Sequence, residues 1–146
     1  MVALGSDHGG YALKEVIRKH LEEKGIAYKD FGAYSEESCD YPLMAQAPCQ
    51  AVLDGECELA LLFCGTGIGI SIAANKMKGI RAAVCSDTFS ARMARAHNNA
   101  NILCLGGRVV GAGLAVELVD AFLETKFEGE RHARRVGQLA DLDQKR

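Results

Sequence analysis

The stretch Leu59-Ala60-Leu61-Leu62-Phe63-Cys64-Gly65-Thr66-Gly67-Ile68-Gly69 joins an apolar run to a glycine-rich segment. The run is continuously apolar rather than alternating, which indicates a strand buried on both faces of a sheet. The alternating glycines that follow predict a tight turn that opens a helix. The stretch therefore predicts one strand–turn–helix unit of a parallel sheet.

Four more short apolar runs occur, and longer amphipathic stretches lie between them. The runs are Val2–Gly5, Ile26–Phe31, Ile80–Cys85 and Ile102–Leu105. Strands that alternate with helices predict βαβ units with right-handed crossovers. We therefore expect an α/β fold, a three-layer α/β/α Rossmann-like sandwich with a five-stranded parallel sheet and a C-terminal helix.

Two helices are indicated by apolar residues that recur on one face. The first face comprises Leu13, Val16, Ile17, His20 and Leu21, and Gly25 follows as a stop signal. Leu114, Leu118 and Phe122 recur at intervals of four near the C-terminus and predict the second helix.

The chain has 146 residues, a length that suits one domain spanning residues 1–146. The segment 130–146 follows Gly129, is strongly charged and has sparse apolar positions at Val136, Leu139 and Leu142. It is compatible with a helix that docks on the body or on a neighbouring subunit. A solvated surface helix or a frayed tail fits the same pattern.

Charge and composition narrow the function classes. The net charge of −2 does not favour nucleic acid, and no apolar run is long enough for a membrane helix. The N-terminus reads as a first strand rather than a signal peptide, so we expect a cytoplasmic protein whose six cysteines, which include no CxxC pair, are reduced thiols. The four histidines lack metal-ligand spacing, and we expect no metal site.

Polar and glycine residues recur where the expected strands end. Ser6-Asp7-His8-Gly9-Gly10 follows the first strand, Cys64–Gly69 the third, Ser86-Asp87 the fourth and Gly106-Gly107-Arg108 the fifth. Ligands of open parallel sheets bind at the carboxyl ends of the strands. We therefore expect the binding site at this edge.

The glycine-rich segment exposes successive backbone N–H groups at a helix start, an arrangement that favours a phosphate or a reaction oxyanion. Cys64 lies at its mouth, where the same field favours the thiolate. A thiolate there suits a general base acting on a carbon-bound proton, with the amides stabilising an enediolate. A cysteine that ends a strand is also commonly a small buried hydrophobe.

A dinucleotide-binding loop is an alternative interpretation of the same glycines. Asp87 follows Gly67 by twenty residues and comes after the next strand, as a ribose-binding acid would. Against this, the loop follows the third strand rather than the first, and the chain is too short for a separate substrate domain.

Other residue pairs could carry chemistry or only structure. Arg131 and Arg135 share a helix face and could clamp a phosphate, although a solvated basic surface gives the same spacing, and we expect no special role for His132. Asp7 or His8 could instead cap the next helix.

The polar cluster around His97 and Asn98 suits proton transfer and hydroxyl binding, or merely a turn. Tyr41-Pro42 could supply a phenol to a pocket rim or simply mark a helix start.

Taken together, these segments make the chain similar to the B-type ribose-5-phosphate isomerases and the related galactose-6-phosphate isomerase subunits. The resemblance covers nearly the whole chain. It rests on Ser6–Gly10, Asp40-Tyr41-Pro42, Cys64–Lys76, Gly79–Ala82, His97–Asn101, Gly106–Gly111 and Gly129–Val136.

The resemblance implies an aldose–ketose isomerisation without metal or cofactor, through a cis-enediolate, in the pentose phosphate pathway. In it, Cys64 is the base between C1 and C2. The enediolate is stabilised by Thr66 and by the amides of Gly65, Gly67, Ile68 and Gly69, with Ser71 nearby. Asp7 and His97 open the sugar ring, Tyr41 and Asn98 contact the sugar, and His8, Arg108, Arg131 and Arg135 hold the phosphate.

The resemblance also implies a homodimer, possibly paired into a tetramer, whose active sites lie between subunits. The segment 130–146 would then be a dimer arm, and some phosphate ligands would come from the partner. Ribose 5-phosphate is the expected substrate, with a six-carbon sugar phosphate such as allose or galactose 6-phosphate as the alternative. No nucleic-acid or membrane partner is expected.

Overall fold

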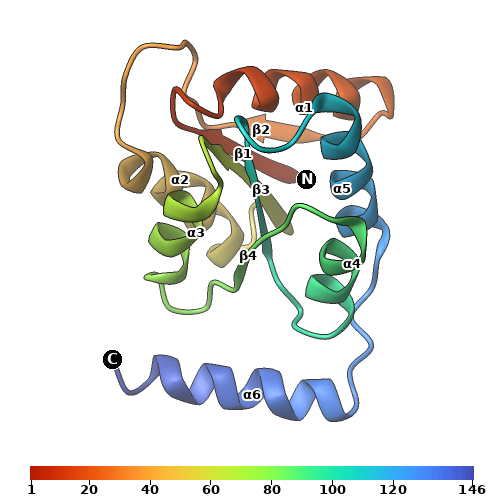
Figure 1. Cartoon of the computed structure of the whole chain (residues 1–146). Helices are drawn as coiled ribbons and strands as arrows, with labels where there is room; N and C mark the ends of the chain where they lie inside the picture. The colour runs from red at the N-terminus through yellow and green to blue at the C-terminus, as the bar shows by residue number, and fades with distance from the viewer.

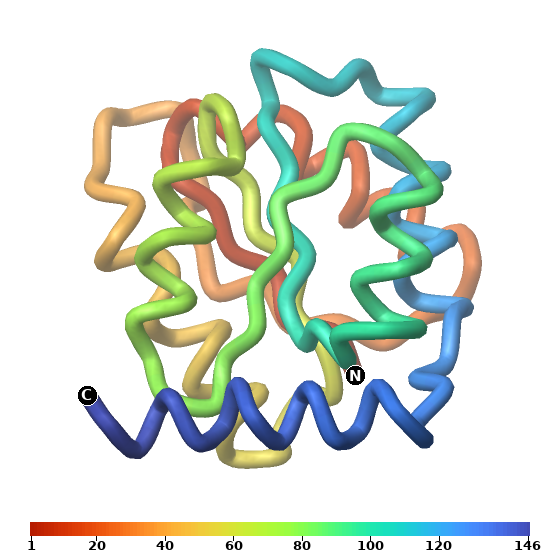
Figure 2. Tube along the Cα trace, turned by 60° about the horizontal axis from the view of Figure 1, so that its bottom comes forward, coloured from red at the N-terminus to blue at the C-terminus, as the bar shows by residue number.

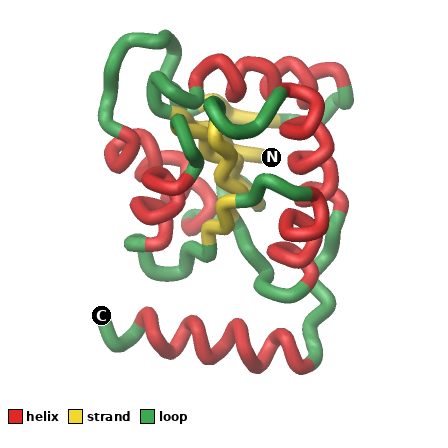
Figure 3. Tube along the Cα trace, in the orientation of Figure 1, coloured by secondary structure: helices red, strands yellow, loops and turns green.

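A computed structural model describes residues 1–146 as a sheet flanked by helices (Figures 1 and 3). In chain order the elements are β1 (Val2–Ser6), α1 (Tyr11–Glu23), β2 (Tyr28–Asp30), α2 (Tyr41–Leu53), β3 (Leu59–Cys64), α3 (Ile68–Asn75), β4 (Ala82–Val84), α4 (Thr88–Ala96), β5 (Ile102–Gly106), α5 (Ala112–Glu124) and α6 (Arg131–Asp143). None of the helices combines the length and apolar character that a bilayer-spanning segment needs.

The sheet is entirely parallel, with strand order β2-β1-β3-β5-β4. Its centre is β3, where Leu61 pairs with Leu4 of β1 on one side and with Leu103 of β5 on the other. A strand forms at each of the five predicted apolar runs, but β1 and β5 extend one residue beyond their runs, and β2 and β4 are shorter than predicted. Ile26 is withdrawn from the sheet because its amide bonds to the last turn of α1, and that of Ile80 bonds to Met77.

Helices cover both faces of the sheet, as predicted (Figure 1). On one face α2 and α3 pack, and on the other α1, α4 and α5. Successive residues of β3 alternate between the two cores, since Leu61 and Phe63 join one cluster while Ala60 and Leu62 join the other. The continuous apolar run is thus explained by burial on both faces.

The buried face of α1 differs from the prediction at two positions. Leu13, Ile17 and Leu21 are buried as expected, but Val16 is 36% exposed and Lys14 is completely buried. The Lys14 Nζ donates to both carboxylate oxygens of Asp30 at 2.7 Å, which offsets the cost of burying its charge.

The helix α6 is ordered rather than frayed, and it crosses the molecule beside β4, at the amino ends of the strands (Figure 2). Its C-terminal end is tied to the body, because the Gly79 amide donates to Asp143 Oδ2 at 2.9 Å and Arg146 donates to the Asn75 carbonyl at 2.7 Å. Leu139 and Leu142 stay exposed. The helix therefore docks on the body through its C-terminal end, while Leu139 and Leu142 line a cavity between the helix and the β4 edge.

Candidate functional site

The strand order reverses between β1 and β3: from β1 the chain moves outward to β2, and from β3 it moves to the other half of the sheet. The connection after β1 leads to α1 on one face, and the connection after β3 leads to α3 on the other. Such a topological switch point leaves a crevice at the carboxyl ends of the two strands, which is the usual ligand position in open α/β sheets. The segments that follow these strands, Asp7–Gly10 and Cys64–Gly69, carry most of the predicted site residues.

Glycine permits these two segments to touch. A Cβ on Gly10 would lie 2.3 Å from the backbone carbon of Phe63, a distance that no side chain tolerates. One on Gly9 would lie 3.1 Å from the Gly65 nitrogen. The loop after β1 therefore lies directly against the loop after β3, as the strand-end rule predicts.

Cys64 ends β3 with only 4% of its surface exposed. The Gly67 amide donates a hydrogen bond to its Sγ at 3.1 Å. This contact depends on Gly67, which caps α3 with a left-handed φ of 80°. An amide N–H that points at sulfur, at the positive end of a helix, stabilises negative charge on that sulfur.

Three amides of the glycine loop have no acceptor within the chain, those of Gly65, Thr66 and Gly69. The Ile68 amide instead donates to Thr66 Oγ1 at 3.2 Å. Ser71 is buried, and its hydroxyl donates to the Ile68 carbonyl at 2.7 Å. Of the amides predicted to stabilise an enediolate, those of Gly65 and Gly69 are thus free to do so.

Asp7 and His8 directly follow β1, at the carboxyl edge of the sheet. Asp7 is buried, and its Oδ1 accepts a hydrogen bond from the Gly10 amide at 3.1 Å, so it supports the turn that leads into α1. The Cys39 amide donates to His8 Nδ1 at 3.2 Å. This bond assigns the neutral ring's proton to Nε2, which makes that atom a donor for an anion.

Tyr41 and Arg108 flank the glycine loop from two sides. Tyr41 begins α2, with Pro42 in the first turn, as one of the two interpretations of this pair has it, and the Tyr41 ring lies 2.8 Å from the place a Gly69 Cβ would occupy. The Arg108 amide donates to the Gly65 carbonyl at 2.9 Å, and its guanidinium also lies against Gly65. A phenol and a cation therefore border the loop that carries Cys64.

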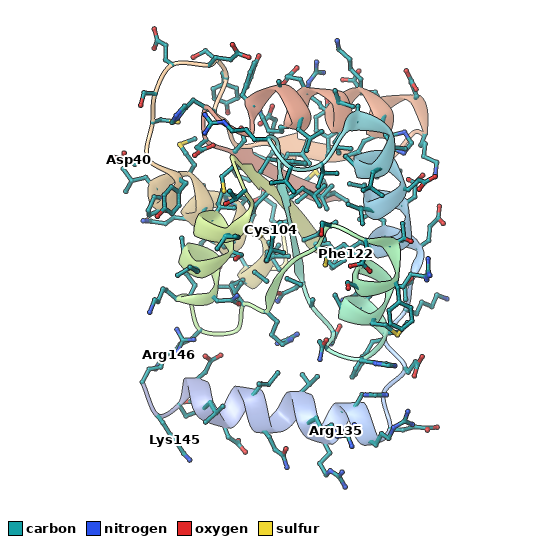
Figure 4. The ribbon with its side chains drawn as sticks, in the orientation of Figure 1. Asp40, Cys104, Phe122, Arg135, Lys145 and Arg146 are labelled. Carbon is teal, nitrogen blue, oxygen red and sulfur yellow. The ribbon has the colours of Figure 1, made fainter.

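The remaining predicted site residues lie at the opposite end of the sheet. His97 caps the C-terminus of α4, Asn98 follows it, and Arg131 and Arg135 are exposed on α6. Figure 2 shows α6 and the loops at the carboxyl ends of the strands on opposite sides of the molecule, and Figure 4 shows Arg135 at its rim. One chain thus does not bring the predicted phosphate ligands of α6 to Cys64.

His132, which was expected to have no special role, is placed by the structure next to His97. This side chain is almost fully buried, and its ring stacks on that of His97, with centroids 4.1 Å apart and planes 8° apart. The first turn of α6 turns it inward. The pairing was missed because 35 residues separate the two histidines, so local spacing holds no signal for it.

The cavities of the single chain do not bring the predicted catalytic residues together, although Thr66 and Ile68 line one cavity of about 290 Å³. None of the five is lined by Cys64, Asp7 or His97. The cavity between α6 and the β4 edge has a volume of about 370 Å³ and is lined partly by Asn98. The predicted site residues of one chain therefore form two separate groups, one at each end of the sheet, which we call half-sites.

Asp87, the acid of the dinucleotide interpretation, has a structural role. It caps α4, accepting from the Ser90 amide at 2.7 Å and from the Ser90 hydroxyl at 2.8 Å. These bonds lower the pKa of the Asp87 carboxyl. Since both carboxylate oxygens are engaged, Asp87 is not preset to receive a ribose.

Most other thiols lie in the core, and all six cysteines are unpaired, as expected. Burial raises the pKa of Cys49 to about 12 and that of Cys85 to about 11. Cys104, at the centre of the sheet in Figure 4, is fully buried, and its pKa is raised further. These thiols stay protonated near neutral pH.

Comparison with known proteins gives matches along the whole chain. The sequence profile of a family described as Ribose/Galactose Isomerase matches residues 2–139. The chain is 48% identical over 145 residues to ribose-5-phosphate isomerase B of Escherichia coli (strain K12), covering 99% of this chain and 97% of that protein.

Solved structures agree. Ribose-5-phosphate isomerase B of Clostridium thermocellum superposes with a TM-score of 0.97 at 51% identity, covering 99% of this chain and 97% of that one. The enzyme of the same name from Mycoplasma genitalium, with bound ribulose-5-phosphate, superposes with a TM-score of 0.93 at 38% identity over 99% and 97% of the two chains.

Proposed function

This chain belongs to the Ribose/Galactose Isomerase family, and from that premise we propose that it interconverts ribose 5-phosphate and ribulose 5-phosphate through a cis-enediolate, with Cys64 as the base. Its relatives make it a sugar-phosphate isomerase of the aldose–ketose type. The assignment of Cys64 as the base is supported by the hydrogen bond that the Gly67 amide donates to its sulfur, and by the free amides of Gly65 and Gly69 in the same loop.

The proton transfer follows from this arrangement. The Cys64 thiolate takes the proton from C2 of the open-chain aldose, the C–H electrons form the C1–C2 double bond, and O1 takes the negative charge. The free amides of Gly65 and Gly69, with Thr66 beside them, stabilise this oxyanion. The O2 proton then moves to O1, the carbonyl forms at C2, and the thiol returns its proton to C1.

Ring opening and phosphate binding use groups from both ends of the sheet. Asp7 and His97 would transfer the protons that open the furanose ring, while Tyr41 and Asn98 would bind its hydroxyls. Phosphate would be held by His8, Arg108, Arg131 and Arg135. The spacing of the two α6 arginines, four residues apart on a helix, allows both guanidiniums to reach one dianion.

A homodimer with shared sites accounts for the two half-sites. In a two-fold symmetric pair, the surface at the carboxyl ends of one sheet can meet α6 and the end of α4 of the partner, and the contact occurs twice. Each site then combines Cys64 of one subunit with the His97 and Arg131 positions of the other. Leu139 and Leu142, which line the open cavity between α6 and the β4 edge, are only partly covered within one chain, and packing of a partner there would bury them, in keeping with α6 as a dimer arm.

We favour ribose 5-phosphate over a six-carbon sugar phosphate as the substrate, because relatives that match along the full chain are named ribose-5-phosphate isomerase B. One additional carbon is discriminated by only about 1–3 kcal/mol in many pockets, so allose or galactose 6-phosphate remains the alternative. A comparison of kcat/KM for the three sugars with the same preparation decides between them.

The test is a direct assay of the purified full chain with ribose 5-phosphate and no added metal. We expect ribulose 5-phosphate to form, and ribose 5-phosphate to form from it in the reverse reaction. Absence of turnover in both directions, with folded protein, would refute the proposal. A parallel titration with NAD and NADP tests the dinucleotide alternative, which requires that one of them binds; absence of binding excludes it.

A further inference from the structure

Outside the glycine loop, three ligand-type side chains converge at the junction of α4, α5 and α6. They are His97 at the end of α4, Glu128 in the connection between α5 and α6, and His132 in the first turn of α6. The Glu128 amide donates to the Ala96 carbonyl at 3.0 Å, which fixes the connection beside His97. The nitrogen and oxygen atoms that could bind a metal lie within 4.8 Å of one another.

The three groups face one another without bonding. The Nε2 atoms of His97 and His132 lie 3.8 Å and 3.7 Å from the same oxygen, Oε1 of Glu128. Both distances are too long for hydrogen bonds. His132 Nε2 is buried and has no hydrogen-bond partner, an arrangement that costs free energy unless something else satisfies the atom.

We propose that His97, Glu128 and His132 bind one divalent transition-metal ion of the Zn²⁺ type, and that this ion inhibits isomerisation by occupying His97. The inhibitory part rests on the proposed function, in which His97 opens the sugar ring. The binding part rests on geometry alone.

The distances suit such an ion. Ligand atoms around tetrahedral zinc lie about 3.4 Å apart, given bonds of about 2.1 Å, so small shifts from 3.7 Å and 3.8 Å bring Glu128 Oε1 and each histidine nitrogen to this spacing, and a water can take the fourth position. The stacked rings must splay apart for both nitrogens to point at one centre. Two imidazoles and a carboxylate suit Zn²⁺ or Co²⁺ and are a poor set for Mg²⁺.

The local electrostatics act in both directions. The pKa of His132 is lowered chiefly by desolvation and further by the neighbouring His97 and Arg131. Its ring is therefore neutral near pH 7, which is the form that binds metals. The Arg131 and Arg135 charges oppose a cation, and the Glu128 carboxylate offsets part of that repulsion. Glu128 is 53% exposed and His97 37%, which leaves a path for the ion to enter.

Direct binding is tested with Co²⁺ and the full-length protein, through its visible absorption, and with Zn²⁺ by calorimetry. We expect one ion per chain, and a weakening of about tenfold or more in Glu128→Gln. The matched control is Glu117→Gln, an exposed acid on α5, which should bind as the unsubstituted protein does. His132→Phe, which keeps a flat ring beneath His97, should also lose binding. No binding, or a thiolate-to-cobalt charge-transfer band, would overturn the site.

Inhibition is measured separately. Zn²⁺ should inhibit turnover while Mg²⁺ does not, and Glu128→Gln should keep basal activity but lose sensitivity to Zn²⁺ by about the same factor as binding. Equal inhibition of Glu128→Gln and the unsubstituted protein would place the inhibitory ion elsewhere and refute the proposal. Failure of the isomerase assay itself would leave the binding measurements intact, so the two proposals fail separately.

Discussion

The Gly67 amide donates a hydrogen bond to Cys64 Sγ at 3.1 Å, which joins the predicted base to the N-terminus of α3. If this sulfur is the base, Cys64→Ala should lower kcat by about 10²–10⁴-fold while leaving the fold intact, because general-base catalysis contributes that much. Turnover of ribose 5-phosphate and thermal unfolding are measured on the same preparation. The control is Cys57→Ala, a buried thiol at the amino end of β3. Unchanged kcat in Cys64→Ala would show that another group takes the C2 proton.

Gly67→Ala should damage both stability and catalysis. Residue 67 has a φ of 80°, and an added Cβ would lie 2.9 Å from the Leu105 backbone carbon. Such strain costs about 1–3 kcal/mol, and relief of it would move the amide away from the sulfur. Urea unfolding and kcat report the two effects. Gly113→Ala, where a Cβ meets nothing within 4 Å, should be neutral or slightly stabilising. Equal stability and kcat in Gly67→Ala and Gly113→Ala would show that the glycine loop accommodates a side chain at residue 67 without strain.

The sheet could be predicted from sequence because its signals are local. The Leu59–Cys64 run, its alternating burial and the glycine turn after it lie within one stretch, and the strand-end rule then brings Asp7 close to Cys64. The same rule could not place His97 or Arg131, because the helix that carries Arg131 lies at the other end of the sheet.

Some positions gave misleading or no sequence signals. Lys14 lies on the buried side of α1, where a charge is not expected, and its partner Asp30 is revealed only by the adjacency of β2. The hydrogen bond from Cys39 to His8 could not be predicted from residue types, because its donor is a backbone amide, which every residue except proline possesses. Glu128 and His132 are four residues apart, the spacing of neighbours on a helix face. That spacing is misleading, because α6 begins only at Arg131 and Glu128 lies outside the helix.

Lys14→Met should destabilise the protein by about 3–5 kcal/mol, because it leaves the Asp30 carboxylate largely buried without its cation. The free energy of unfolding in urea measures this loss. Lys29→Met provides the contrast, since the Lys29–Glu56 pair is about half exposed, and it should cause little change. A small effect of Lys14→Met would mean that solvent reaches Asp30 in the folded state.

His132 should make stability depend on pH. Its pKa in the folded protein is lowered by desolvation, by His97 and by the Arg131 and Arg135 charges, against the opposing effect of Glu128. The unfolded chain, with an ordinary value of about 6.5, takes up a proton first as the pH falls. Stability is therefore full above pH ~6.5, declines below it, and levels off below the folded pKa. Urea unfolding between pH 7.5 and 5.5 should show a flatter dependence in His132→Phe, and equal slopes would contradict this assignment.

A mixing experiment tests the shared site most directly. Cys64→Ala disables one half-site and Arg131→Ala the other, so each variant alone should be inactive or strongly impaired. In a heterodimer with sites between subunits, one site carries both defects and the other neither. Random co-assembly makes half of the dimers mixed, each with one intact site, and should restore about a quarter of the activity of the unsubstituted protein. Sites confined to one subunit would each keep a defect in every combination, and mixing would restore nothing. Co-expression with two affinity tags isolates the mixed dimers, whose specific activity should rise to about half.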